Sequence, residues 1–187
     1  MNNDKFRNKY RIPSARAQWH EYDGGLYFVT VCTHQKLHYF GKIVGNEMIL
    51  SAIGKYAVIC IEELPEHFPD AEIPLYVVMP NHIHLIVAID RETKTSHNVG
   101  RDVACNVSER KTENVIMSTM SPKHGTLATI IRSLKSTITR YAHENQIEFS
   151  WQSRFYDHII RDVEDCNRIA EYIENNVVLW DMDKLNK

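Results

Sequence analysis

Short apolar runs bounded by turn residues alternate along this chain with longer stretches of helical periodicity. Runs rich in β-branched and aromatic residues predict strands over 26–33, 75–78 and 82–89. A short hairpin is predicted over 38–50, where Val44-Gly45-Asn46-Glu47 supplies turn residues. The last two strands are close enough in sequence to pair in an antiparallel hairpin.

Three other stretches place apolar residues three or four positions apart, which is typical of amphipathic helices. They follow residues that can cap a helix N-terminus: Ser51, Thr126 and Asp162. Pro65 is expected to end the first of these helices. The order of elements predicts an α+β fold, a ferredoxin-like two-layer sandwich with a mainly antiparallel sheet and helices on one face.

The 187 residues are enough for one domain with a sizeable core, and we assign it to residues 21–187. A polar stretch of mixed charge around 91–123 is expected to be an exposed insertion. Residues 1–20 are expected to form a basic N-terminal arm, with a solvated, poorly ordered terminus as the alternative. Its basic residues are Lys5, Arg7, Lys9, Arg11 and Arg16.

Composition narrows the class of protein. The chain lacks an apolar stretch of about 20 residues, the length that spans a bilayer, so no membrane partner is expected. The polar N-terminus does not resemble a signal peptide, and four scattered cysteines form no C-x-x-C pair, so we expect a cytoplasmic protein. The net charge of −2 counts mildly against nucleic-acid binding unless basic residues gather locally.

The run Met79-Pro80-Asn81-His82-Ile83-His84 places two histidines two residues apart at the start of a predicted strand. Alternate side chains of a strand share a face, so His82 and His84 should point the same way and Ile83 the other. Neutral imidazoles bind Zn, Mn, Fe, Ni and Cu, so the pair is half of a metal site. The alternative is that the two rings only form hydrogen bonds near the strand end.

The last helix offers a partner for this pair. Its expected inward stripe comprises Ile169, Tyr172, Ile173, Asn176, Val177 and Trp180. Tyr172 and Asn176 are four residues apart and therefore one above the other. An inward Asn176 oxygen could complete a His-His-Asn site beside the Tyr172 hydroxyl. The alternative is a core tyrosine and an asparagine at a fraying helix end.

Three motifs, in this order, resemble the HUH single-tyrosine transposases of insertion sequences, closest to the REP-associated tyrosine transposases. They are Met79-Pro80-Asn81-His82-Ile83-His84-Leu85, Trp151-Gln152-Ser153-Arg154-Phe155-Tyr156-Asp157-His158 and Glu171-Tyr172-Ile173-x-Asn175-Asn176. The resemblance implies an RRM-like sheet and a divalent metal, Mg or Mn, held by His82, His84 and Asn176. It implies Tyr172 as the nucleophile that cleaves single-stranded DNA near hairpins and forms a 5′-phosphotyrosine.

DNA contacts are expected from basic and aromatic side chains of the second half of the chain. The candidates are Arg132, Lys135, Arg140, Trp151, Arg154 and Arg161. Lys135 and His158 are candidate helpers of the tyrosine, while Tyr156 lacks an inward partner four residues on. A monomer and a homodimer both stay open. Two other functions also stay open: a catalytically silent nucleic-acid-binding domain, and a structural zinc site that adds Cys32 and His34 to the histidine pair.

Overall fold

The computed structural model describes residues 5–6, 10–11, 24–90 and 125–186. Of the expected basic arm, only the backbone of two short antiparallel strands is described, β1 (Lys5–Phe6) and β2 (Tyr10–Arg11). The expected insertion around 91–123 lies outside the described residues. None of the helices in the described part of the chain is both long and apolar enough to cross a membrane.

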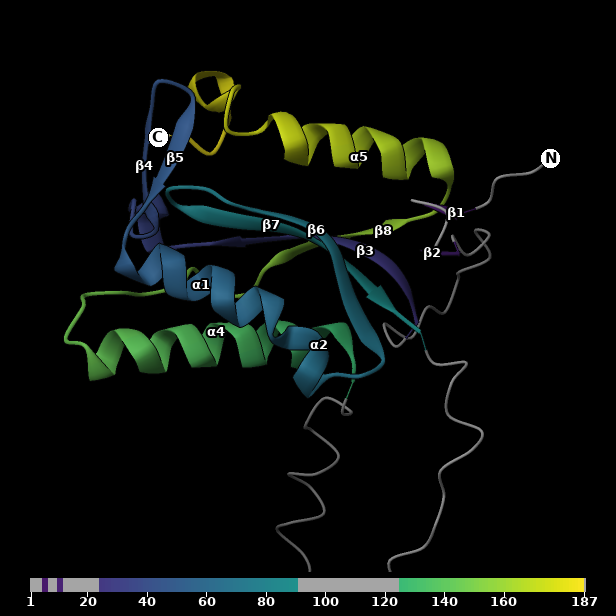
Figure 1. The fold of residues 1–187 in the computed structure, drawn as a ribbon, viewed down its shortest axis with the longest axis horizontal. Helices are drawn as coiled ribbons and strands as arrows, with labels where there is room; N and C mark the ends of the chain where they lie inside the picture. The colour runs from purple at the N-terminus through teal and green to yellow at the C-terminus, as the bar shows by residue number, and fades with distance from the viewer. Residues whose placement is uncertain (1–4, 7–9, 12–23, 91–124, 187) are drawn as a thin grey trace, which may run out of the picture.

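A four-stranded sheet with the order β6-β7-β3-β8 forms the centre of the molecule (Figure 1), and every neighbouring pair is antiparallel. Its strands are β3 (Gly25–Cys32), β6 (Ala71–Val78), β7 (His82–Ile89) and β8 (Tyr156–Ile160). The expected α+β fold with a mainly antiparallel sheet is confirmed. Strand β8 was not predicted, because it begins with polar and charged residues. Strand β6 begins earlier than predicted, before a register shift between Glu72 and Leu75.

Helices cover both faces of this sheet (Figure 1), so the expectation of helices on one face was wrong, because apolar residues of the strands alternate between two buried faces. On one face lie α1 (Ala52–Glu62) and α4 (Leu127–Glu144), and on the other lies α5 (Val163–Asn175). The predicted caps are confirmed, since Ser51, Thr126 and Asp162 each accept a backbone N–H of the first turn. The expectation for Pro65 was wrong in detail. Helix α1 ends before it, and Pro65 lies in the first turn of α2 (Leu64–His67), where a missing N–H costs nothing.

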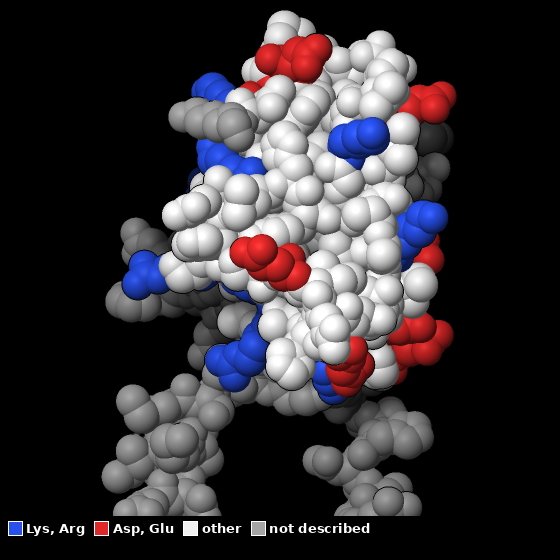
Figure 2. Space-filling view, turned by 90° about the vertical axis from the view of Figure 1, so that its left-hand side faces the viewer, with Lys and Arg blue, Asp and Glu red and all other residues white. Residues whose placement is uncertain are grey.

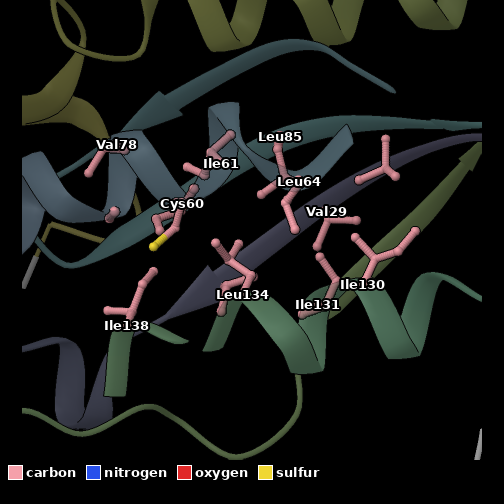
Figure 3. Close-up of a cluster of buried hydrophobic side chains, with 14 of the residues drawn as sticks. Val29, Cys60, Ile61, Leu64, Val78, Leu85, Ile130, Ile131, Leu134 and Ile138 are labelled. Atoms are coloured by element: carbon pink, nitrogen blue, oxygen red, sulfur yellow. The ribbon is translucent and has the colours of Figure 1, made fainter. Parts of the chain in front are cut away.

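The alternation of side chains along the strands divides the core in two. Val29, Leu85 and their neighbours on one face pack against α1 and α4 (Figure 3). Leu26 and Ile86 on the other face pack with Ile169 of α5. The α5 side of the sheet is therefore the face to which the even-numbered residues of β7 belong.

Two smaller features complete the fold. Strands β4 (Gly41–Val44) and β5 (Glu47–Leu50) form the predicted hairpin, whose turn residues Gly45 and Asn46 have φ values of 59° and 65°, as a type I′ turn requires.

Beyond α5 the chain forms the short 3₁₀ helix η2 (Trp180–Met182) and continues to residue 186. This C-terminal segment lies next to the start of β7, because the Asn81 side chain donates a hydrogen bond to the Leu185 carbonyl.

Candidate functional site

His82 and His84 lie on the α5 side of β7, opposite Cys32 and Thr30 of β3. Their ring centroids are 4.4 Å apart, and both side chains are buried, with exposures of 0% and 2%. Ile83 lies in the core cluster on the opposite face. The prediction that the two histidines share a face is thus confirmed, and two imidazoles stand side by side in the interior.

Each histidine is held through its Nδ1 atom. His82 Nδ1 lies 2.7 Å from the Asn81 Oδ1, which can only accept, so His82 Nδ1 carries the proton and Nε2 keeps its lone pair. The Asn81 amide is fixed in that orientation because its Nδ2 donates to the carbonyls of Lys36 and Leu185, at 3.2 and 2.8 Å. His84 Nδ1 lies 2.8 Å from the Thr30 hydroxyl. A hydrogen-bond partner on one ring nitrogen sets the tautomer of a metal-binding histidine and directs its other nitrogen toward the metal.

Tyr172 reaches the histidines from α5. Its hydroxyl lies 3.3 Å from His84 Nε2, and its ring meets that of His84 at a centroid distance of 5.2 Å. The side chain is 42% exposed, so Tyr172 lies at the edge of the buried stripe and not within it as predicted. The hydroxyl therefore contacts the buried pair while part of the ring is open to solvent and to a substrate.

Asn176, directly after the last residue of α5, is 2% exposed, whereas the neighbouring Asn175 is exposed and donates to the Glu171 carbonyl. The helical spacing thus identified the inward asparagine. In the described residues two buried side-chain atoms lack a hydrogen-bond partner, and they are His82 Nε2 and Asn176 Oδ1. Leaving a buried polar group unpaired costs about 1–3 kcal/mol.

The sequence reasoning missed Asp183, which follows η2. Its Oδ2 lies 3.4 Å from the Tyr172 hydroxyl and 3.3 Å from Asn176 Nδ2. One ligand atom each of His82, His84 and Asp183 lies within 4.8 Å of the other two, so the three could hold a metal ion. A carboxylate in a short segment without periodicity gave no signal that it folds back onto the helix.

The donor set fits a divalent cation. The two unpartnered atoms are a lone-pair nitrogen and an amide oxygen, both metal ligands, and neither can satisfy the other because both are acceptors. Asp183 adds one negative charge to otherwise neutral ligands. A cation bound to His82 Nε2 and Asn176 Oδ1 would therefore pair two atoms that the protein alone leaves unpaired.

The protonation of the site is set by burial. Burial lowers the pKa of His82 to about 4 although the charge of Asp183 opposes this, and burial together with His82 lowers the pKa of His84 well below 6.5. Both rings are therefore neutral at pH 7, the form that binds metal. Burial and the nearby Asp183 charge raise the pKa of Tyr172 above 10, so its phenol carries a proton at neutral pH.

The predicted DNA-binding residues do not all come together. Arg132, Lys135, Arg140 and Arg154 line one open groove of about 750 Å³ along α4, together with His143. Arg161, just beyond β8, is not among the groove residues. Trp151 is half-buried against Phe40 and Phe149, and its indole nitrogen donates to the Lys135 carbonyl, so Trp151 is in large part a packing residue.

The two candidate helpers of Tyr172 lie elsewhere. Lys135 is on α4, on the opposite face of the sheet, where its ammonium donates to the carbonyls of Gln152 and Arg154 at 2.8 and 3.0 Å. His158 lies 2.7 Å from the Asp165 carboxylate at the start of α5, seven residues before Tyr172. We therefore assign His158 to the attachment of α5 and Lys135 to the groove.

The zinc alternative gains no support within the described residues. The cluster of candidate metal ligands found there holds His82, His84 and Asp183, without Cys32 or His34. Cys32 faces His82 across the ladder, and His34 lies in the short 3₁₀ helix η1 (His34–Lys36) that follows β3. Neither the Cys32 sulfur nor a His34 ring nitrogen is therefore grouped with the ligand atoms of the buried pair.

Comparisons with known proteins agree with the fold. The chain is 36% identical over 165 residues to an uncharacterized protein of Haemophilus influenzae, a match that covers 86% of this chain and 84% of the relative. A solved structure of a REP-associated tyrosine transposase bound to a REP hairpin has a TM-score of 0.54 at 19% identity, covering 90% of this chain and 76% of the other. A putative transposase of Deinococcus radiodurans R1 has a TM-score of 0.38 at 11% identity, covering 86% and 95%. No family model matches the chain.

Proposed function

This chain belongs to the same protein family as the uncharacterized Haemophilus influenzae protein, and we propose that it is a metal-dependent DNA transposase of the HUH type. It cleaves and rejoins single-stranded DNA next to hairpins. The proposal rests on its buried site and on a fold similar to that of a REP-associated tyrosine transposase. The observation that carries the proposal is the position of the Tyr172 hydroxyl, 3.3 Å from His84 Nε2. The same site holds two buried ligand atoms without partners, His82 Nε2 and Asn176 Oδ1.

His82, His84 and Asn176 would hold the metal, Mg or Mn, with Asp183 close enough to add its carboxylate. When bound, the cation would neutralise the negative oxygens of the phosphodiester as a Lewis acid. Asn81 and Thr30 keep both imidazole rings turned toward that position. Neutral ligands suit this task because they leave most of the positive charge of the cation for the phosphate.

Tyr172 supplies the nucleophile. Its oxygen forms a bond to phosphorus while the bond from phosphorus to the 3′ oxygen breaks, which leaves a 5′-phosphotyrosine and a free 3′ hydroxyl. The phenol loses one proton and the 3′ oxygen gains one, so the step is balanced without an external energy source. Because burial and the Asp183 charge raise the pKa of Tyr172, the hydroxyl has to give up its proton as it attacks.

We infer that the substrate is a hairpin-bearing single strand, since the solved REP-associated tyrosine transposase with this fold is bound to a REP hairpin. The groove along α4 offers Arg132, Arg140 and Arg154 for phosphates. Tyr156, at 60% exposure, is free to stack on a base. A single strand or a stem would thus have cationic contacts on the α4 face and the tyrosine on the α5 face.

The test is a covalent protein–DNA adduct. The protein is incubated with hairpin-bearing single-stranded DNA and Mn²⁺, and the products are separated on a denaturing gel. We expect an adduct that is lost in Tyr172→Phe and weakened in His82→Ala. Tyr156→Phe is the matched control, because it removes the hydroxyl of another exposed tyrosine and keeps a ring that can stack on a base, so it should keep the adduct.

Two results would contradict the proposal. An adduct that survives in Tyr172→Phe would show that another residue is the nucleophile. Hairpin binding without any adduct, in the presence of Mg²⁺ or Mn²⁺, would instead favour the catalytically silent DNA-binding domain.

A further inference from the structure

Asp183 contacts two members of the site through a single oxygen. Its Oδ2 accepts from Asn176 Nδ2 at 3.3 Å and from the Tyr172 hydroxyl at 3.4 Å. Resting on the proposed function, we propose that Asp183 is a positioning residue, which turns the Asn176 oxygen toward the metal position and holds the tyrosine hydroxyl. Neither a sequence motif nor helical periodicity points to this residue.

The first part of the argument concerns the two ends of the Asn176 amide. The NH₂ and the oxygen are alike in size, so packing alone does not choose between them. An ionised carboxylate has no proton to donate, so only the NH₂ end can face Asp183. The oxygen is thereby directed to the opposite side, where it is buried and unpartnered, as is His82 Nε2.

The second part concerns the Tyr172 hydroxyl, which has one proton and two acceptors within reach. These are Asp183 Oδ2 at 3.4 Å and His84 Nε2 at 3.3 Å, which is an acceptor when the His84 ring carries its proton on Nδ1, next to the Thr30 hydroxyl. A metal ion on His84 Nε2 would use the lone pair that accepts this proton. Asp183 is then the remaining acceptor, so the hydroxyl stays at the site when the histidine is occupied.

The carboxylate is itself held in place. Asp183 Oδ1 accepts the backbone N–H of Leu185 at 2.7 Å, and the Leu185 carbonyl accepts from the Asn81 side chain at 2.8 Å. Trp180, 7% exposed, packs its ring 6.0 Å from that of His82. Asn81 therefore contacts both His82 and the segment that carries Asp183, which couples the position of the carboxylate to that of the histidine.

A direct metal ligand and a positioning residue respond differently to an isosteric change. In Asp183→Asn an oxygen at the Oδ2 position can still accept from Asn176 and Tyr172, while the charge and the bond that Oδ1 accepts from the Leu185 N–H are lost. Asp183→Ala removes all of these interactions. Mn²⁺ affinity is measured by calorimetry on the full chain without DNA. We expect Asp183→Ala to weaken binding about 10- to 100-fold, as removal of an outer partner of a metal ligand does, and Asp183→Asn to stay within roughly threefold of the unaltered protein.

A metal-free readout accompanies the titration. The side-chain NH₂ resonances of Asn176 should shift in Asp183→Ala and keep their positions in Asp183→Asn. Asp181→Ala is the control, since Asp181 is exposed on η2, and it should alter neither measurement.

The outcomes separate the two claims. Unchanged Mn²⁺ affinity in Asp183→Ala would overturn the positioning role alone. Equal losses in Asp183→Ala and Asp183→Asn would also overturn it, because the charge and not the hydrogen bond would then be decisive. An unaltered protein that binds no Mn²⁺ would contradict the metal site of the proposed function as well, whatever the adduct assay shows.

Discussion

Individual side chains in this site are fixed by partners that leave two atoms, His82 Nε2 and Asn176 Oδ1, without a hydrogen bond. Asn81 accepts the Nδ1 proton of His82, Thr30 pairs with His84 Nδ1, and Asp183 accepts from the NH₂ end of Asn176. A network of this kind is costly without a ligand, because buried acceptors remain without donors. This cost is what we expect of a site that binds the proposed metal ion.

Thr30→Val tests this arrangement at the residue scale. Valine has nearly the shape of threonine but cannot form the hydrogen bond to His84 Nδ1, so the ring loses its fixed direction. We expect Mn²⁺ affinity, measured by calorimetry, to fall about tenfold or more. Thr139→Val is the matched control, because that hydroxyl donates to the Lys135 carbonyl on an exposed helix face, and an equal loss there would contradict the role of Thr30.

The sequence predicted the positions of those residues that follow from the regular repeat of a strand or a helix. His82 and His84 share a face because strands have a period of two, and Asn176 lies near Tyr172 because helices bring residues four apart together. Asp183 follows no period, since the chain leaves α5 and returns through a 3₁₀ turn. Its contacts depend on tertiary structure, which is why the sequence did not reveal it.

At the scale of elements, α5 is the part that brings the tyrosine to the histidines. Ile169 and Ile173 attach it to the sheet, and Asp165 attaches its first turn to His158 of β8. Helix α5 was predicted from its periodicity and its Asp162 cap. The strand that anchors it, β8, was not predicted, because it is an edge strand whose first residues are polar and whose pattern is too short to recognise.

Asp162→Ala tests how α5 is stabilised. The Asp162 carboxylate accepts the Asp165 N–H at 2.7 Å, and loss of an N-cap of this kind costs about 1 kcal/mol. We expect the free energy of unfolding, from denaturant titration, to fall by that amount. Glu171→Ala, an exposed change on the same helix, should leave it nearly unchanged, and equal effects of the two would contradict the capping role.

The whole molecule carries its two candidate sites on the two faces of its sheet. The buried histidines and Tyr172 lie on the α5 side, while the cationic groove lies along α4. On the side of the molecule shown in Figure 2, basic and acidic side chains are scattered among uncharged ones, in line with the net charge of −2. A local groove therefore reconciles a slightly acidic chain with the nucleic-acid substrate that we propose.

The salt dependence of DNA binding tests the groove. If Arg140 neutralises a phosphate, Arg140→Gln should weaken hairpin binding and reduce the slope of log K against log salt by about 0.7, the value for one phosphate of a single strand. Fluorescence anisotropy at several salt concentrations measures both. Arg161→Gln is the control outside the groove, and a slope that changes there but not in Arg140→Gln would place the DNA elsewhere.

The overall architecture was largely predictable, and the placement of function on it was not. Strand and helix periods indicate an α+β fold, but they do not say which helix covers which face. The sequence grouped six residues as DNA-binding, and the structure brings four of them to one groove while Arg161 lies apart and Trp151 packs inward. Charge and aromatic character alone do not distinguish a residue in the groove from one outside it or from one that packs in the interior.

The central claim is that Tyr172 carries the DNA after cleavage, and mapping the attachment site tests it most directly. The adduct formed with hairpin-bearing single-stranded DNA is digested with a protease and a nuclease, and the modified peptide is identified by mass spectrometry. We predict a nucleotide joined through its 5′ phosphate to Tyr172. A nucleotide on any other residue, or a 3′ linkage to Tyr172, would contradict the account.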